Sequence, residues 1–115
     1  MINGWPETDE SKKLLIEQIH SFAMGEIAPK AKELDETGSF PTEIVKQLGE
    51  MGLMGMMVPE QWGGAGMDVV SYAMALEEIA SACASTAVIM SVNNSLVCYP
   101  IQAFGNDDQK KRFLT

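Results

Sequence analysis

The sequence predicts an all-α fold, an orthogonal or up-and-down bundle of about five to six helices with one Gly-rich loop at residues 59–67. Apolar residues recur at spacings of three and four over most of the chain, which is the helical period. The length of 115 residues, with 46% hydrophobic and 21% charged residues, suits one globular core. We therefore expect residues 1–115 to form a single helical domain.

The first helix is expected from about Thr8 to Asp35, with Thr8 or Asp9 as its cap. Pro29 falls inside this span, so a kink or a break is expected there. His20 lies off the apolar stripe, and we expect it to be solvated rather than catalytic. The stripe itself consists of Leu15, Ile19, Phe22, Ala23 and Ile27.

The second helix follows Thr37-Gly38 and starts at Ser39-Phe40-Pro41, because proline suits a first helical turn. Gly52 closes it, and the Met-rich segment 53–58 is expected to be an adaptable packing surface. Its apolar stripe is Ile44, Val45, Leu48 and Met51.

The loop Pro59–Gly66 has the glycines of a phosphate cradle but lacks the other features of one. No clearly alternating strand precedes it, and no Gly-Lys-Ser/Thr ending follows. We expect a turn that folds Trp62 back onto the core.

Asp68 is the expected cap of the third long helix. Glu77 and Glu78 invite an acid–base interpretation, but adjacent residues point about 100° apart on a helix and cannot share one site. Their expected place is solvent or a domain boundary. The apolar stripe is Val69, Tyr72, Ala73, Leu76, Ile79, Ala80 and Cys83.

No charged residue occurs between Ile79 and Asn106. A membrane span is not expected, because several Ser, Thr and Asn residues and Pro100 interrupt the ~20 apolar residues that a span needs. We expect a helix that opens at Ser85-Thr86 and is surrounded by protein on every side. One face would carry Val88, Val92 and Leu96, with Ile89 and Asn93 beside them.

The last helix is expected after Gly105, with Asn106 and Gln109 in a capping box, and it would run to Thr115. Its bases, residues 110–112, are expected to pair with Asp107 and Asp108. Because the chain stops inside this helix, we interpret it as a fragment.

The net charge of −8 argues against nucleic-acid binding. Cys83 and Cys98 are expected to be reduced, buried thiols, and with a single histidine no metal site is expected. The acidic stretch from Trp5 to Glu10 favours neither a signal peptide nor a retained transit peptide.

With these segments placed, the chain resembles the N-terminal helical domain of flavin-dependent acyl-CoA dehydrogenases. Each motif is weak alone, but their order and spacing cover nearly the whole chain. The motifs are Ile27-Ala28-Pro29, Gly38-Ser39-Phe40-Pro41, residues 48–55, the aromatic-Gly-Gly-x-Gly pattern within 58–66, residues 75–80, Asn94-Ser95-Leu96, Phe104-Gly105-Asn106 and residues 109–114.

The resemblance implies that the full-length protein is an oxidoreductase of fatty-acid β-oxidation that uses FAD for α,β-dehydrogenation of an acyl-CoA thioester. The flavin-binding β domain and the C-terminal helical domain with its carboxylate base would be absent here. This fragment would then be inactive, with no catalytic residue and no confident cofactor ligand of its own. It would form part of the acyl-chain pocket through Val88, Ile89, Val92 and Leu96, with Asn93 as a further candidate.

The same resemblance implies short or medium acyl chains, an electron-transfer flavoprotein as partner, and a homo-oligomeric enzyme. The compartment would be the bacterial cytoplasm, or the mitochondrial matrix after removal of a transit peptide.

Three alternatives stay open at this stage. The four pocket candidates can simply pack the core of this domain. The chain can be a stand-alone helical interaction module. An acyl carrier protein is the third, because Asn94-Ser95-Leu96 approaches a carrier motif, although the residue before the serine is not Asp.

Overall fold

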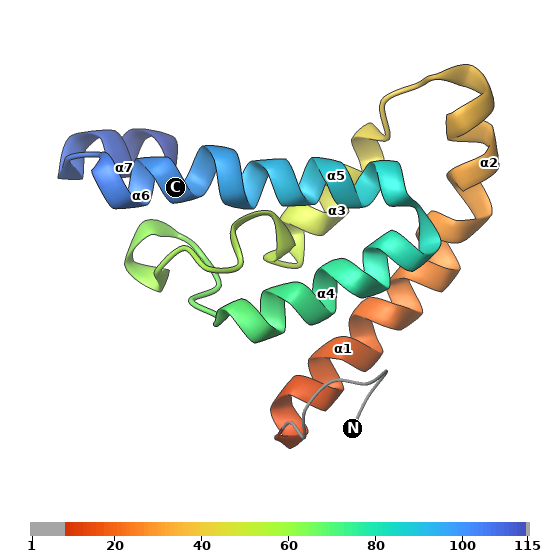
Figure 1. The fold of residues 1–115 in the computed structure, drawn as a ribbon, viewed down its shortest axis with the longest axis horizontal. Coiled ribbons are helices and arrows are strands. Elements are labelled where there is room, and N and C mark those ends of the chain that lie inside the picture. The colour runs from red at the N-terminus through yellow and green to blue at the C-terminus, as the bar shows by residue number, and fades with distance from the viewer. Residues whose placement is uncertain (1–8, 115) are drawn as a thin grey trace.

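The computed structural model describes residues 9–114, and every regular element among them is helical. Two π-helical turns, Ala23–Ile27 and Asn93–Cys98, join α1 to α2 and α5 to α6, so the segments form five rods (Figure 1). This confirms the all-α prediction. The segments are α1 (Glu10–Phe22), α2 (Ala28–Thr37), α3 (Thr42–Glu50), α4 (Val69–Ala82), α5 (Ala84–Val92), α6 (Tyr99–Phe104) and α7 (Asp107–Phe113), with 3-10 turns at Leu53–Gly55 and Glu60–Trp62. The possible cap at Thr8, the acidic stretch from Trp5 and the end of the last helix at Thr115 lie outside the described residues.

Both π turns end just before a proline. Pro29 and Pro100 each occupy the start of the following helical segment, where a missing N–H is tolerated. A proline ring would otherwise clash with the carbonyl four residues earlier. The wider turn avoids this, since the N–H of Ala28 bonds to Ala23 O and that of Tyr99 to Asn94 O. The predicted interruption at Pro29 is thus a π turn, and the rod from α5 continues through Pro100 to Phe104.

The helix α4 lies at the centre of a flat molecule with extents of 41 × 38 × 19 Å. It packs against α1 on one side and α5 on the other, and α3 also contacts α5 (Figure 1). The side chains between these helices form one apolar core. Its buried members are Ile16, Ile19, Ala23, Ile27, Ile44, Leu48, Leu53, Met56, Met74, Ala75, Ile79, Ala87 and Met90.

The helix ends follow the sequence signals closely. The side chain of Asp9 accepts from Lys12 N, and that of Asp68 accepts from Ser71 N, so both caps are confirmed. Asn106 and Gln109 form the expected capping box. Gly38 and Gly52 adopt left-handed φ angles of 66° and 80° at the ends of α2 and α3, a conformation that favours glycine.

The expected stripe of α4 is partly wrong. Val69 and Ala80 are exposed, whereas Ser71, Met74 and Glu78 are buried. The reason is that α4 is packed between α1 and α5, so it buries two adjoining faces rather than one stripe. Ala75 and Ile79 lie where those faces meet the core.

The expected solvent position of Glu78 is also wrong, although Glu77 is exposed as expected. Glu78 is 6% exposed, and its Oε2 lies 2.6 Å from Nδ1 of His20 on α1. His20 itself is exposed, in line with the prediction, but it is the partner of a buried carboxylate. This contact joins α1 to α4, so the structure gives His20 a structural role.

Two smaller expectations also need correction. Met51 is 38% exposed, so the buried stripe of α3 reduces to Ile44 and Leu48 with Val45 half-buried. Trp62 is half-buried and does not belong to the core cluster. Its ring instead lies under the ammonium of Lys110, 6.0 Å from the ring centroid.

A buried asparagine ties the long α5–α6 rod to the Met-rich segment. The side-chain oxygen of Asn94 accepts from Met56 N, and its amide nitrogen donates to Leu53 O and Met90 O. Asn94 is 3% exposed. The bonds to Leu53 and Met56 would have to be replaced by water if the rod moved away, so they fix its rotation, whereas the bond to Met90 lies within the rod.

Replacing Asn94 with Ala should lower the free energy of unfolding by about 3 kcal/mol, because buried backbone groups of Leu53 and Met56 lose their partners. Urea denaturation monitored by circular dichroism measures this. The matched control is Ser95→Ala on the same π turn, where an exposed hydroxyl is lost and a change within about 0.5 kcal/mol is expected. Equal effects of the two substitutions would contradict the anchoring role.

The ion pair between Lys12 and Asp68, 2.8 Å from Nζ to Oδ2, predicts an acid-sensitive contribution to stability. The hydrogen bond from Lys12 holds the pKa of Asp68 well below its ordinary value of 3.8. Since the folded-state pKa is lowered, the stabilisation is present above about pH 4 and is lost as the pH falls through the folded-state pKa. Asp68→Asn, which keeps a capping side chain, should therefore lower the urea midpoint at pH 7 but have a smaller effect at pH 3.

The reciprocal variant Lys12→Met should reproduce that pH dependence. If either variant differed from the original chain equally at pH 7 and pH 3, the pair would have no titrating contribution.

Candidate functional site

The uncharged rod from α5 to α6 has one buried and one exposed face. Thr86, Ala87, Met90 and Asn94 are buried against the rest of the domain. On the opposite face Val88, Val92 and Leu96 are 60%, 42% and 68% exposed, with Ile89 half-buried beside them. We call the residues Val88, Ile89, Val92 and Leu96 the apolar stripe.

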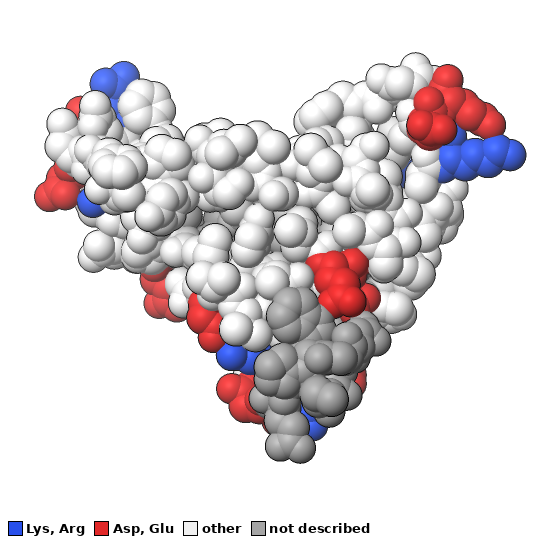
Figure 2. Space-filling view, in the orientation of Figure 1, with Lys and Arg blue, Asp and Glu red and all other residues white. Residues whose placement is uncertain are grey.

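Within residues 9–114 this helix keeps an exposed face, so the expectation that protein surrounds it on every side stays a prediction for the whole protein. Among residues 9–114, α4, α3 and the Met-rich segment pack against the rod, and α7 contacts it at its α6 end. The pocket candidates do lie together, because residues four apart share a helix face. In Figure 2 the upper edge of the molecule, where α5 runs, carries no Lys, Arg, Asp or Glu, and the visible charges lie toward the ends and the lower part.

Asn93, the further candidate, is half-buried and points away from the centre of the stripe. Its amide nitrogen donates to Met54 O and contacts Sγ of Cys98 at 3.7 Å. Asn93 thus helps Asn94 to hold the rod on the Met-rich segment.

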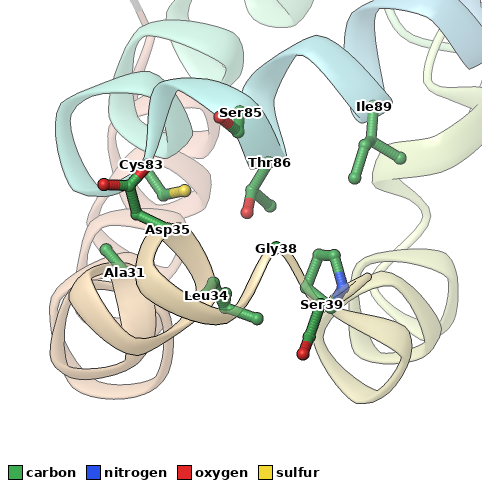
Figure 3. Close-up of a pocket in the computed structure, with 10 residues that line it drawn as sticks. Ala31, Leu34, Asp35, Gly38, Ser39, Cys83, Ser85, Thr86 and Ile89 are labelled. Carbon is green, nitrogen blue, oxygen red and sulfur yellow. The ribbon is translucent and has the colours of Figure 1, made fainter.

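A cavity of about 250 Å³ adjoins the stripe at the N-terminal end of α5 (Figure 3). One wall is the first turn of α5, with Ser85, Thr86 and Ile89. The other consists of the end of α2 and the turn that follows it, including Asp35 and Ser39. Ile89 belongs to both the stripe and the cavity lining, so the two meet at this residue.

Thr86 lines this cavity, but its hydroxyl oxygen is buried rather than open to it. The residue is 1% exposed, and its Oγ1 has no hydrogen-bond partner among residues 9–114. Figure 3 shows its side chain directed toward Gly38, across the cavity. A buried hydroxyl without a hydrogen-bond partner is destabilising.

The sequence reasoning did not identify Asp35, Ser39 or Thr86 as site residues. The available signal was weak, since Thr86 is a single hydroxyl inside an apolar helix. Asp35 and Ser39 lie about fifty residues earlier, and only the packing of α2 near α5 brings them to Thr86.

From Trp62 to Met67, each N–H group of the Gly-rich loop donates to a carbonyl within the domain and is not available to a phosphate. Its successive N–H groups at residues 63–66 already donate to the carbonyls of Glu60, Pro59, Gly55 and Val58. A side chain at Gly64 would overlap the carbonyl oxygen of Val58, so a glycine is needed here for close packing of the loop. The prediction of a structural turn is confirmed, and no described residue forms a phosphate cradle there.

Neither cysteine is fully buried, which corrects the sequence-based expectation. Cys83 and Cys98 are half-buried and free of disulfides. Partial burial raises the pKa of the Cys98 thiol, so this thiol favours its protonated form. No group of three metal-ligating side chains occurs within residues 9–114.

The basic residues 110–112 do not form a patch. Lys110 lies over Trp62 and Arg112 over Phe113, 5.2 Å from the ring centroid. In the part of the chain that the structure describes, no helix combines the length and apolar character needed to cross a bilayer.

Comparison with known proteins identifies the domain. The family model for the acyl-CoA dehydrogenase N-terminal domain matches residues 9–115. The mitochondrial short-chain specific acyl-CoA dehydrogenase of Rattus norvegicus is 49% identical over 95% of this chain and 26% of its own length. This chain thus spans about a quarter of the length of the curated relatives it matches.

Two solved structures share the fold. The butyryl-CoA dehydrogenase of Megasphaera elsdenii superposes with a TM-score of 0.87 and 32% identity, covering 96% of this chain and 30% of that one. A structure described as the electron transferring flavoprotein of Acidaminococcus fermentans gives 0.88 and 32%, covering 94% and 28%. The match over residues 9–115 decides against the acyl-carrier alternative, and the chain belongs to the family of acyl-CoA dehydrogenase N-terminal domains.

Proposed function

We propose that the whole protein is an oxidoreductase that introduces a double bond between the α and β carbons of an acyl-CoA thioester, with FAD as the hydride acceptor. Within it, this domain forms one wall of the acyl-chain pocket through the apolar stripe. The observation that carries the proposal is that Val88, Val92 and Leu96 form an exposed aliphatic face on a rod without a charged residue. The relatives named above are acyl-CoA dehydrogenases.

An aliphatic chain is well matched by such a face. Burying one methylene contributes about 0.8 kcal/mol, roughly fourfold in affinity, and a charge beside the chain would oppose this. An apolar wall also excludes water, and a dry site strengthens electrostatic stabilisation of a developing charge at the thioester carbonyl. The role of this domain is therefore to bind and orient the chain.

The described residues do not fit a flavin. The N–H groups of the Gly-rich loop are engaged within the domain, and no other glycine-rich turn offers its backbone to a diphosphate. We therefore assign FAD and the carboxylate base to parts of the protein outside this chain. No catalytic residue is proposed among residues 9–114.

Further assignments rest on the relatives. Short or medium acyl chains are proposed, because the rat relative is described as short-chain specific and the Megasphaera relative as acting on butyryl-CoA. An electron-transfer flavoprotein is the proposed electron acceptor, in keeping with the likeness to the Acidaminococcus structure. A homo-oligomer is proposed for the whole enzyme, located in the bacterial cytoplasm or the mitochondrial matrix.

Substitution of Val92 tests the pocket assignment in the full-length enzyme. Val92→Gly should shift the chain-length preference toward longer acyl-CoA substrates, because space opens in the wall. Val92→Phe should reduce kcat/KM for the longest accepted chain by about tenfold or more while sparing the shortest, because a side chain closes the pocket. The measurement is kcat/KM across a series of acyl-CoA substrates of about four to twelve carbons, in which successive chains differ by about two methylene groups.

Val69 provides the matched control, since it is an exposed valine on α4 outside the stripe. Val69→Gly and Val69→Phe should leave the chain-length profile unchanged. An unaltered profile in both Val92 variants would overturn the pocket assignment.

A further inference from the structure

We propose that Asn94, with Asn93 beside it, is a positioning residue that determines how sharply the apolar stripe rejects acyl chains that are too long. This inference rests on the proposed function and deepens it, because it assigns the chain-length limit to two polar side chains outside the stripe. It is carried by the hydrogen bonds that join the π turn Asn93–Cys98 to the backbone of residues 53–56.

Asn94 lies behind the C-terminal end of the stripe. Val92 precedes it by two residues and Leu96 follows it by two, and residues two apart lie on roughly opposite faces of a helix. Burial agrees with this geometry, since Asn94 is buried whereas Val92 and Leu96 are both exposed. Asn94 therefore cannot touch an acyl chain, and it acts on one only through the position of these two aliphatic side chains.

The hydrogen-bond partners of Asn94 are backbone groups that belong to the core. Its side chain accepts from Met56 N and donates to Leu53 O, both at 2.9 Å. The side chains of Leu53 and Met56 are buried in the core cluster. The carbonyl of Met56 also accepts from Met67 N, at the end of the Gly-rich loop. A movement of the rod would thus break bonds to a segment that the rest of the domain holds in place.

Asn93 supplies a second attachment on the flank of the rod. Its amide nitrogen donates to Met54 O, and the thiol of Cys98 lies 3.8 Å from the same oxygen. Consecutive residues of a helix point about 100° apart, so the two asparagines hold the rod from two directions. Attachments in two directions oppose both rotation of the rod and its displacement from the Met-rich segment.

A fixed wall discriminates between chain lengths more sharply than a loose one. A chain that is one methylene too long must displace packed atoms, and this costs more where the wall cannot yield. Apolar contacts alone would let the rod shift, because they are not directional. Hydrogen bonds to buried backbone groups oppose such a shift, because each group left without a partner is destabilising. The two asparagines therefore make the wall formed by Val92 and Leu96 resistant to displacement.

The test measures a discrimination ratio in the full-length enzyme, at a temperature well below unfolding. The ratio is kcat/KM for the preferred acyl-CoA divided by kcat/KM for a substrate about four carbons longer. Asn94→Ala should lower this ratio about three- to tenfold, because the released wall yields to the longer chain. Asn93→Ala removes one bond at a half-buried position and should lower the ratio to a smaller degree. It serves as the second variant if Asn94→Ala folds poorly.

Ile19→Ala is the matched control for lost stability. Ile19 is fully buried on α1, which packs against α4, so its truncation destabilises the domain while the hydrogen bonds of both asparagines stay in place. The discrimination ratio of this variant should equal that of the original enzyme. A ratio lowered equally by Ile19→Ala and Asn94→Ala, or one unchanged in both asparagine variants, overturns the positioning role.

A double variant separates this inference from the proposed function. If Asn94 acts by positioning the stripe, Asn94→Ala should change the ratio less in a Val92→Gly background than in the original enzyme, because the wall is already open there. Equal changes in the two backgrounds would overturn the positioning role and leave the pocket assignment in place. The pocket assignment itself depends on the Val92 series alone, so the two can fail separately.

Discussion

The arrangement of the whole domain depends on how the uncharged rod from α5 to α6 is held. A long helix without charged residues could rotate to bury either of its apolar faces, since hydrophobic contacts are not directional. The two hydrogen bonds of Asn94 to the backbones of Leu53 and Met56 remove this freedom, because they hold Asn94 against the Met-rich segment. The buried polar side chain thus decides which aliphatic residues face outward.

The outward face and the cavity beside it are two consequences of that rotation. The apolar stripe remains exposed over the length of α5, and Thr86 is turned from the stripe toward the end of α2. The exposed aliphatic surface and the cavity therefore meet at Ile89.

Under the proposed function, this domain would supply a wall of the acyl-chain pocket rather than a catalytic group. Its glycine-rich loop uses its N–H groups for its own folding, and its buried carboxylate, Glu78, is engaged with His20. What the domain offers is a shaped and uncharged surface on a well-packed helix. Such a surface contributes to a reaction by binding the substrate and excluding water.

Local signals in the sequence sufficed for the helix types and their ends, because caps, left-handed glycines and prolines act within a few residues. Asp9, Gly38, Asp68 and the Asn106–Gln109 box are examples. The order of the sequence motifs also indicated the family. Periodicity placed Val88, Val92 and Leu96 on one helix face, and the family resemblance added Ile89 to the pocket candidates. The packing partners of the helices could be identified only from the tertiary structure. Three features join residues that are far apart in the chain: the two-sided burial of α4, the His20–Glu78 contact, and the cavity between Asp35, Ser39 and Thr86. These contacts follow from how the helices pack rather than from any local pattern.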